Sequence, residues 1–281
     1  MQAVVARHIH SPVELNRYLS VRESFRQIRR FVHGRILDFG ASYGLSMLAL
    51  REIGLDDVDG VEIEAARVNL GWIILREAGA DPTRLLHVPE TRHLPYQDAT
   101  FGTVVANAVL EHIPQPRAPY LRELWRVLQP GGCLIVAETP NKYLPYDYHT
   151  THMMWVPWLP SKIARAYAIW RGRYRPDRNW AHSGWRGLGY YELVAALPRR
   201  SYRLMNEESR PRHRWLRALR LPASLLDPYP LWILRKLEGQ PARLVGQPTH
   251  QRAAGAFSEE ALRPAGGEGA AALEPVRQVE S

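Results

Sequence analysis

The sequence lacks several features on which whole classes of protein depend. Among its 281 residues there is one cysteine, Cys133, which excludes a disulfide framework and a cysteine-rich zinc site. Cys133 lies in an apolar run and is expected to be a small core residue. The longest stretch without a charged side chain, 148–161, holds 14 residues, fewer than the roughly 18 that a membrane-spanning helix needs. No apolar segment follows the N-terminus, so no signal peptide is expected.

Lysine is also scarce, and the charge is unevenly spread. The chain has 37 Lys and Arg against 28 Asp and Glu, a net charge of +9, but the segment 161–220 alone holds 15 basic and 4 acidic residues. Six of the nine tryptophans lie between Trp155 and Trp215. A basic, Trp-rich region favours contact with an anionic or interfacial partner. The 46% hydrophobic and 23% charged residues are typical of a globular domain that buries a core of its own.

Strand and helix patterns alternate over the first half of the chain. Strands are expected at 35–39, 58–63, 84–88, 103–108 and 133–137, and helices at 11–33, 45–53, 65–78 and 119–128. The strands are continuous apolar runs, which favours a parallel sheet covered by helices on both faces. Such sheets bind ligands at the carboxyl ends of their strands.

After residue 137 the regular alternation of strands and helices ends. Residues 138–190 are rich in Pro, Trp, Tyr, His and Arg. The patterns that follow predict further helices at 162–171, 190–197 and 212–219, strands at 201–206 and 231–237, and a disordered tail from 240.

The sharpest motif is the segment 37–44, Leu-Asp-Phe-Gly-Ala-Ser-Tyr-Gly, which joins the first strand to a helix. Glycines let the backbone approach a ligand, and a helix start offers unpaired N–H groups. Asp38 and Ser42 stand two residues either side of Gly40, so the dinucleotide fingerprint Gly-x-Gly-x-x-Gly fails, and no P-loop lysine follows. An acid at Asp38 suits a ligand with positive charge. The alternative is a plain strand-to-helix turn.

A second acid, Glu62, ends the second strand 22 residues after Gly40. A carboxylate there can accept hydrogen bonds from both ribose hydroxyls of a nucleoside. An isolated glutamate is more often a surface residue, but the position after a strand and the spacing from the glycine loop favour a functional one.

These residues and four further motifs resemble the class I S-adenosylmethionine-dependent methyltransferases, in particular their type 11 domain. The further motifs are Glu90-Thr91-Arg92-His93-Leu94-Pro95-Tyr96, the strand and loop from Phe101 to Ile113, the turn Arg126-Val127-Leu128-Gln129-Pro130-Gly131-Gly132, and Thr139-Pro140-Asn141. The resemblance covers residues 30–142 and, more loosely, 186–238. It implies a three-layer Rossmann-like α/β sandwich with a mostly parallel seven-stranded sheet.

The resemblance also implies a cofactor, S-adenosyl-L-methionine, and residues to bind it. Gly40, Ala41 and Gly44 would pack on its methionine part, with Asp38 holding the amino group. Glu62 would bind the ribose hydroxyls, Glu90 and Thr91 would face the adenine, and Asn107 would border the methionine part. The predicted set is completed by two neighbours of these residues, Ser42 and Ile63.

Two positions depart from the family pattern. Gly102 stands where the family usually has Asp before the fourth strand, which puts the geometry of strand entry in doubt. Glu90 stands where Asp is commoner. We expect an N-terminal helical segment at 1–33, the cofactor-binding core at 34–142 and an acceptor-site insertion or lid at 143–189. The C-terminal part of the core sheet is expected at 190–239 and the tail at 240–281.

Methyl transfer is an in-line displacement at a sulfonium methyl, in which the protein chiefly positions the nucleophile and a base assists a hydroxyl acceptor. The candidates near the carboxyl edge are His112, His149 and His152. The alternative for His112 is that it braces its loop together with Glu111. His149 and His152 have a spacing that could ligate a metal in a helix, but no third ligand is evident and the threonines between them disfavour a helix, so no metal site is expected.

The segment 144–160 resembles, more weakly, an insertion of methyltransferases in bacterial glycan, lipid or natural-product pathways, and would form a lid. Met154, Trp155 and Trp158 are expected to be core of this insertion, with the lid surface as the alternative. The stretch 162–175 alternates aromatic, aliphatic and basic residues. A solvated face is favoured, and contact with an anionic membrane is the alternative.

The sequence therefore predicts a cytoplasmic methyltransferase for a small-molecule, glycan or lipid-like acceptor, methylated at oxygen. The alternatives are an RNA or membrane-lipid methyltransferase that uses the segment 161–220, the latter in peripheral contact with the inner membrane, and a non-catalytic cofactor-binding module. Nucleic acid is the less favoured partner, because residues 107–110 lack the Asp/Asn-Pro-Pro-Tyr/Phe motif of nucleobase methyltransferases. A similar segment, 227–230, is expected to be a turn away from the cofactor.

Overall fold

The computed structural model describes residues 2–9, 12–205, 216 and 223–238. Its centre is a seven-stranded sheet in the order β3-β2-β1-β4-β5-β7-β6. The strands are β1 (Ile36–Phe39), β2 (Val58–Glu62), β3 (Leu85–His87), β4 (Phe101–Asn107), β5 (Leu128–Ala137), β6 (Tyr202–Leu204) and β7 (Trp232–Lys236). The first five strands are paired in parallel, and β7 runs antiparallel to both β5 and β6. The predicted mostly parallel Rossmann-like sheet is confirmed.

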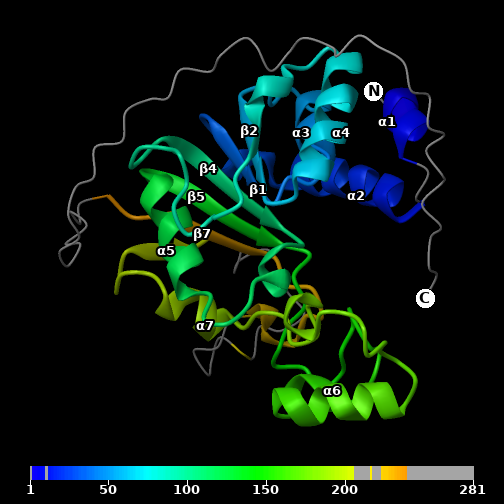
Figure 1. Cartoon of the computed structure of the whole chain (residues 1–281). Coiled ribbons are helices and arrows are strands. Elements are labelled where there is room, and N and C mark those ends of the chain that lie inside the picture. The colour runs from blue at the N-terminus through cyan, green and yellow to red at the C-terminus, as the bar shows by residue number, and fades with distance from the viewer. Residues whose placement is uncertain (1, 10–11, 206–215, 217–222, 239–281) are drawn as a thin grey trace. The chain divides into compact units, whose positions relative to one another are not determined.

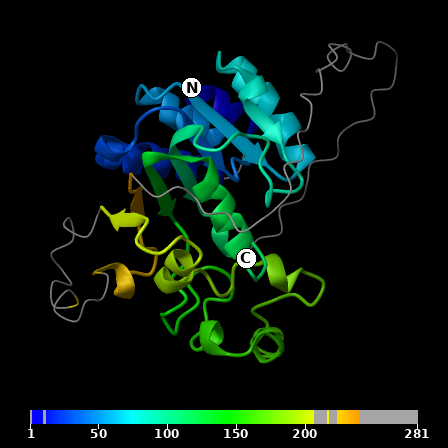
Figure 2. The same cartoon turned by 90° about the vertical axis from the view of Figure 1, so that its left-hand side faces the viewer.

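Helices cover both faces of the sheet (Figures 1 and 2). One face carries α1 (Gln2–His8), α2 (Pro12–Ile28), α3 (Leu45–Glu52) and α4 (Ala65–Glu77), and the other carries α5 (Ala118–Val127) and α7 (Tyr190–Ala195). Because side chains alternate along a strand, Ile36 packs in the first core and Leu37 in the second. Cys133 is buried in the first core, as predicted.

The structure differs from the expected elements in three places. The first predicted helix ends as an α-helix at Ile28 and continues as a 3-10 turn over Arg29–Phe31, and a separate helix, α1, precedes it. β5 begins at Leu128, directly after α5 and five residues before the predicted start. The predicted helix 212–219, apart from Leu216, and the tail 240–281 lie outside the described residues.

The absence of a side chain at Gly102, where the family usually has Asp, has a steric reason. A Cβ at this position would lie 2.4 Å from the carbonyl oxygen of His33 and 3.2 Å from the Cα of Gly34. The chain before β1 crosses the start of β4 here, and the hydroxyl of Thr103 donates to the same carbonyl at 2.9 Å. The usual aspartate has no room in this crossing, so strand entry is held by Thr103 instead.

The insertion 143–189 contains the 3-10 helices Val156–Trp158 and Trp180–His182 and the α-helix α6 (Ser161–Trp170). It has a small core of its own, formed by Met153, Val156, Ala164, Ala168, Tyr174, Trp180 and Trp185. The expectation that Met154, Trp155 and Trp158 belong to this core is wrong, because each side chain is exposed. In the described part of the chain, no helix has both the length and the apolar character needed to cross a membrane.

Candidate active site

The glycine loop leaves β1 and enters α3 at the carboxyl edge of the sheet. Gly40 has a φ of +80°, and a Cβ there would lie 2.4 Å from a methyl carbon of Val109. The glycine is therefore needed both for the turn and for the approach of the loop that follows β4. Asp38, at the end of β1, is 1% exposed, and Ala41 and Ser42 are also buried.

Glu62 holds this loop to the end of β2. One carboxylate oxygen accepts the backbone N–H of Ser42 at 2.9 Å. The other accepts the N–H groups of Ile63 and Glu64, at 2.8 and 3.0 Å. A carboxylate has about four acceptor positions, so one remains for a further donor such as a ribose hydroxyl. The Ile63 side chain is 53% exposed beside it, which leaves an apolar surface at the same edge.

Glu90 follows β3 and pairs with Arg92. The guanidinium binds both carboxylate oxygens, at 3.0 and 2.5 Å, and the Arg92 backbone N–H donates to one of them at 2.9 Å. These hydrogen bonds from Arg92 lower the pKa of Glu90 to about 2. The carboxylate is thus ionised and able to accept from an amine, but Arg92 occupies it in this structure. Thr91 is buried next to it, and Asn107, at the end of β4, is also buried.

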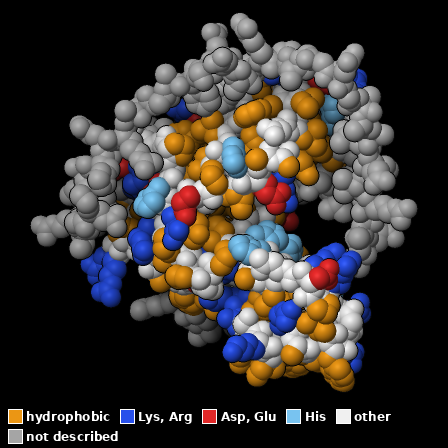
Figure 3. All heavy atoms as spheres, viewed as in Figure 1, with side chains coloured by type: hydrophobic (Ala, Val, Ile, Leu, Met, Phe, Trp, Pro, Cys, Tyr) orange, Lys and Arg blue, Asp and Glu red, His pale blue; other side chains and the backbone are white. Residues whose placement is uncertain are grey.

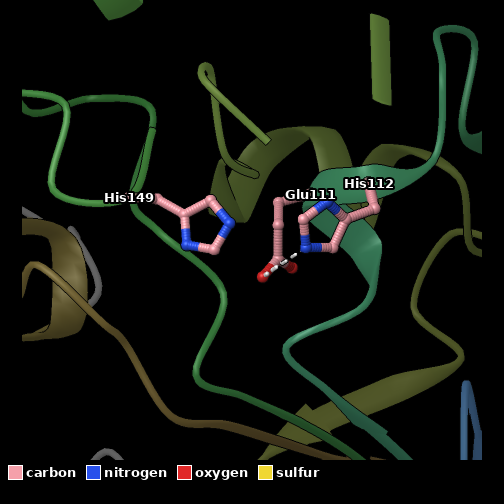
Figure 4. A group of neighbouring side chains, drawn as sticks. All are labelled: Glu111, His112 and His149. Atoms are coloured by element: carbon pink, nitrogen blue, oxygen red, sulfur yellow. Dashed lines mark ion pairs between the residues drawn. The ribbon is translucent and has the colours of Figure 1, made fainter. Parts of the chain in front are cut away.

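Two of the three predicted catalytic histidines meet, and a carboxylate lies between them (Figure 4). Glu111 and His112 come from the 3-10 helix Leu110–His112 after β4, and His149 comes from the loop after β5. Ligand atoms of the three side chains lie within 4.8 Å of one another. The ring centroids of His112 and His149 are 5.1 Å apart. His152 is outside this group, with an exposed side chain.

Hydrogen bonds fix the orientation of this group, here called the Glu111–His149 group (Glu111, His112 and His149). Glu111 is 1% exposed, and its carboxylate accepts the hydroxyl of Thr139 at 2.9 Å, which ties the loop after β4 to the loop after β5. Asp147 accepts the backbone N–H of His149 at 3.0 Å and that of Thr151 at 2.7 Å. An aspartate that accepts N–H groups two to four residues ahead forms a local turn, which places the His149 side chain.

Behind this group, an ion-pair network joins the insertion to the core. The buried guanidinium of Arg117 donates to the carbonyls of Ile113 and Gly187, at 2.9 and 2.8 Å, and to the carboxylate of Glu192 on α7, at 3.0 Å. Lys142 donates to the same carboxylate. Burial alone would raise the pKa of Glu192, but the hydrogen bond from Lys142 and the charge of Arg117 outweigh it and lower this pKa.

Sequence reasoning considered Glu111 only as a brace of its loop and missed Asp147 and Arg117 as organisers of this site. Glu111 had a usable signal, because it lies in the loop that follows a buried strand, at the ligand-binding edge. Asp147 had a weaker one, since an aspartate before His-Thr-Thr is typical of a turn. Arg117 had no signal, because its partners Gly187 and Glu192 are 70 and 75 residues away.

Residues 37–136 match the methyltransferase domain family. This match covers the glycine loop, Glu62, Glu90 and the Glu111–His112 pair, together with nearly all of the five parallel strands β1 to β5. The chain carries a class I S-adenosylmethionine-dependent methyltransferase domain. The predictions of this family and of its cofactor, S-adenosyl-L-methionine, are confirmed.

Similar proteins share this methyltransferase domain. Cycloartenol-C-24-methyltransferase 1 of Oryza sativa subsp. japonica is 28% identical over 127 residues, 42% of this chain and 37% of the relative. Demethylmenaquinone methyltransferase of Clavibacter sepedonicus is 33% identical over 114 residues, 40% of this chain and 43% of the relative. The chain thus spans less than half the length of these two curated relatives.

A solved structure shows the fold beyond the methyltransferase domain. It is a protein assigned as a sarcosine dimethylglycine methyltransferase from Galdieria sulphuraria, 12% identical in sequence. The likeness covers 80% of this chain and 86% of that one, with a TM-score of 0.50. At this level of identity the likeness extends to the fold alone.

Proposed function

We propose that this chain transfers the methyl group of S-adenosylmethionine to an oxygen atom of an apolar, lipid-like small molecule. The observation that carries the proposal is the meeting of two sets of residues at one sheet edge. Glu62 and the glycine loop lie at the carboxyl ends of β2 and β1, and the Glu111–His149 group lies at the carboxyl ends of β4 and β5. The first set suits the cofactor and the second suits the acceptor.

In this proposal, each residue of the cofactor half contacts a particular part of S-adenosylmethionine. Glu62 would hold the ribose hydroxyls, while Ile63 would cover one face of the adenine and Glu90 would accept from its amine. Asp38 and Asn107 would face the charged methionine end. Because the sulfonium is already activated, the protein needs only to bind it and to keep the acceptor in line with the methyl group.

The acceptor half is suited to a hydroxyl. A hydroxyl must lose its proton as its oxygen bonds to the methyl carbon, and a histidine–carboxylate group is able to take up that proton. The two relatives described above are named for the acceptors cycloartenol and demethylmenaquinone, which supports a lipid-like acceptor; the first is named for methylation at C-24, so the argument for oxygen rests on the histidine–carboxylate group alone.

An exposed apolar surface on the insertion further supports a lipid-like acceptor (Figure 3). Ile163 and Trp170 lie seven residues apart on the face of α6 opposite the buried Ala164 and Ala168, with exposed fractions of 55% and 76%. Trp155 and Trp158 are exposed in the segment before α6, with ring centroids 5.4 Å apart. Among the described residues, nothing buries the face of α6 that carries Ile163 and Trp170.

Basic residues are frequent on α6 and directly after it. Lys162, Arg171, Arg173, Arg175 and Arg178 are exposed on α6 or just after it, with Asp177 the one exposed acid between 161 and 178. Tryptophan and basic side chains together fit the interface of an anionic bilayer, where the rings enter the headgroup layer and the cations meet lipid phosphates. We propose that this face docks on such a membrane and presents the site to a lipid-like acceptor.

The test is methyl transfer from labelled S-adenosylmethionine into three separate substrates: a bacterial lipid extract, a soluble glycan fraction and total RNA. The expected result is label in the lipid fraction that resists both mild acid and mild base. Mild base would release the label from a methyl ester but not from a methyl ether. Label in RNA alone would contradict the proposal and favour the nucleic-acid alternative. Cofactor binding without label in any fraction would favour a non-catalytic module.

A further inference from the structure

We infer that Glu111, His112 and His149 bind a divalent transition-metal ion, for which Zn²⁺ is the best fit. Its role in catalysis rests on the function proposed above, but the binding site itself does not. Three observations carry the inference: the convergence of the donor atoms, the hydrogen bond that orients one imidazole, and the burial of the carboxylate.

The donor atoms converge from two separate segments. One carboxylate oxygen of Glu111 and one ring nitrogen from each histidine lie within 4.8 Å of one another, and the two rings flank the carboxylate (Figure 4). Ligands of one Zn²⁺ ion are each about 2.0–2.2 Å from the metal, so the three atoms need to approach by about an ångström. We expect the half-buried His149, rather than the buried Glu111, to make this movement when the ion binds.

The hydrogen bond of His112 fixes its tautomer. Its Nδ1 lies 2.8 Å from the carbonyl oxygen of His182, which only accepts, so Nδ1 carries the proton and donates. In the neutral ring, Nε2 then bears a lone pair, and it faces a carboxylate oxygen of Glu111 at 3.9 Å. Metal-ligating histidines characteristically donate their other N–H to a backbone carbonyl in this way.

Burial of Glu111 distinguishes this group from ordinary surface clusters. The side chain of Glu111 is 0% exposed, and Thr139 donates to its second oxygen at 2.9 Å. Burial holds the carboxylate in a fixed orientation, as a metal site needs of its ligands. A ligating carboxylate is usually hydrogen-bonded in turn, as this one is by Thr139.

The donor set indicates which metal binds. Two imidazoles and one carboxylate suit Zn²⁺ and also Fe²⁺, whereas Mg²⁺ and Ca²⁺ prefer oxygen ligands; Zn²⁺ is chosen because methyl transfer needs no change in oxidation state of the metal. Three protein ligands leave the fourth tetrahedral position open, as in catalytic rather than structural zinc sites.

The open position would take the acceptor oxygen, and the metal would then replace the histidine–carboxylate base of the proposed function, because ring nitrogens that bind the ion cannot accept the proton. A metal-bound hydroxyl has a lowered pKa, so its proton passes to solvent water and leaves an alkoxide. The alkoxide oxygen forms a bond to the methyl carbon while the bond from that carbon to sulfur breaks. The electron pair of that bond stays on sulfur, so the sulfonium becomes the neutral thioether of S-adenosylhomocysteine, and the acceptor leaves as its methyl ether.

The experiment is a calorimetric titration of the chelator-treated full chain with ZnCl₂. We expect one high-affinity ion per chain. The substitutions His149→Ala and Glu111→Gln should each weaken its binding at least tenfold. The matched control is His152→Ala, because His152 is three residues from His149 but exposed and outside the group. It should bind zinc as the wild type does.

Two readouts separate this inference from the proposed function. S-adenosylhomocysteine affinities of the three variants should equal that of the wild type, since none of these residues holds the cofactor, and the two histidine variants should also melt as the wild type does when zinc is absent. Zinc bound equally by the wild type and by His149→Ala, or no stoichiometric zinc at all, would overturn the metal site while cofactor binding stood. Zinc binding at this site in a chain that fails to bind S-adenosylhomocysteine would support the metal site and contradict the proposed function.

Discussion

The carboxylate of Glu62 accepts the backbone N–H of Ser42 at 2.9 Å. This contact joins the end of β2 to the glycine loop, which means that the shape of the loop depends on an acid 20 residues further along the chain. The same carboxylate also binds the backbone of Ile63 and Glu64. Glu62 thus organises the backbone at the cofactor edge in addition to its proposed contact with ribose.

The substitution Glu62→Ala should therefore weaken binding of S-adenosylhomocysteine by about 1–3 kcal/mol, or roughly 5–150-fold, the scale for losing hydrogen bonds to a charged group. Calorimetric titration measures the change. The matched control is Glu64→Gln, because the Glu64 side chain is exposed and pairs with Arg67 at 2.6 Å. Equal affinities of Glu62→Ala and the wild type would refute the assignment of Glu62.

Most of the fold could be predicted because its strands are short, continuous apolar runs separated by helical periodicity. Each helix except α1 coincides with a predicted one within a few residues, as far as the structure describes the chain. The helix α1 was missed because its seven residues are too short to show a period. The early start of β5 was missed because Pro130 and Gly131 are typical of turns, and the strand accommodates Gly131 at a φ of +79°.

The crossing of the chain over β4 gives a prediction about stability. Gly102→Ala should lower the free energy of unfolding by about 1–3 kcal/mol, because the new methyl would overlap the His33 carbonyl and force the backbone apart. Urea denaturation measures it. The comparison variant is Gly79→Ala, because no atom lies within 4 Å of its new Cβ. Its free energy of unfolding should fall by only about 1 kcal/mol, since an alanine is strained at the φ of +67°. An equal or smaller loss at Gly102 would show that the crossing is not tightly packed.

The site was harder to predict than the fold. The residues of the glycine loop and Glu62 lie close together in sequence and follow parallel strands, so their meeting at one edge could be inferred. The segment 227–230 was expected to be a turn away from the cofactor, and this stays a prediction. Because β7 runs antiparallel to β5, its start lies beside the carboxyl end of β5, and Asn141 donates to the carbonyls of Pro228 and Asp227. The antiparallel direction of β7, which brings this segment beside Asn141, was not predicted from the sequence.

The network around Glu192 predicts a dependence of stability on pH. The pKa of Glu192 is lowered in the folded state, so its contribution to stability is complete above the unfolded pKa of about 4.3 and is lost as pH falls through the folded value. Glu192→Gln should lower the free energy of unfolding by about 3 kcal/mol at pH 7, because Arg117 is left buried without its charge partner.

Denaturation of the wild type and of Glu192→Gln at pH 7 and pH 3.5 tests this account. The difference between the two proteins should shrink at the lower pH. A difference that stays constant would mean that Glu192 acts through packing alone.

The exposed face of α6 gives a prediction about membranes. Trp170→Ser should weaken binding to anionic vesicles at least about fivefold, since burial of a large aromatic side chain contributes about 1.5–3 kcal/mol. Trp170 is 76% exposed, so the melting temperature should not change. Cosedimentation with vesicles of phosphatidylglycerol and phosphatidylcholine measures the effect. Neutral vesicles should bind weakly, and unchanged binding by Trp170→Ser would exclude this face as the contact.

The central claim is that this sheet edge binds S-adenosylmethionine for methyl transfer. Its most direct test is calorimetric titration of the wild-type chain with S-adenosylhomocysteine, with NAD as the control ligand. We predict one site per chain of micromolar affinity for S-adenosylhomocysteine and no heat from NAD, because Asp38 and Ser42 replace the glycines of a dinucleotide loop. No binding of S-adenosylhomocysteine, or binding of NAD with equal affinity, would contradict the account.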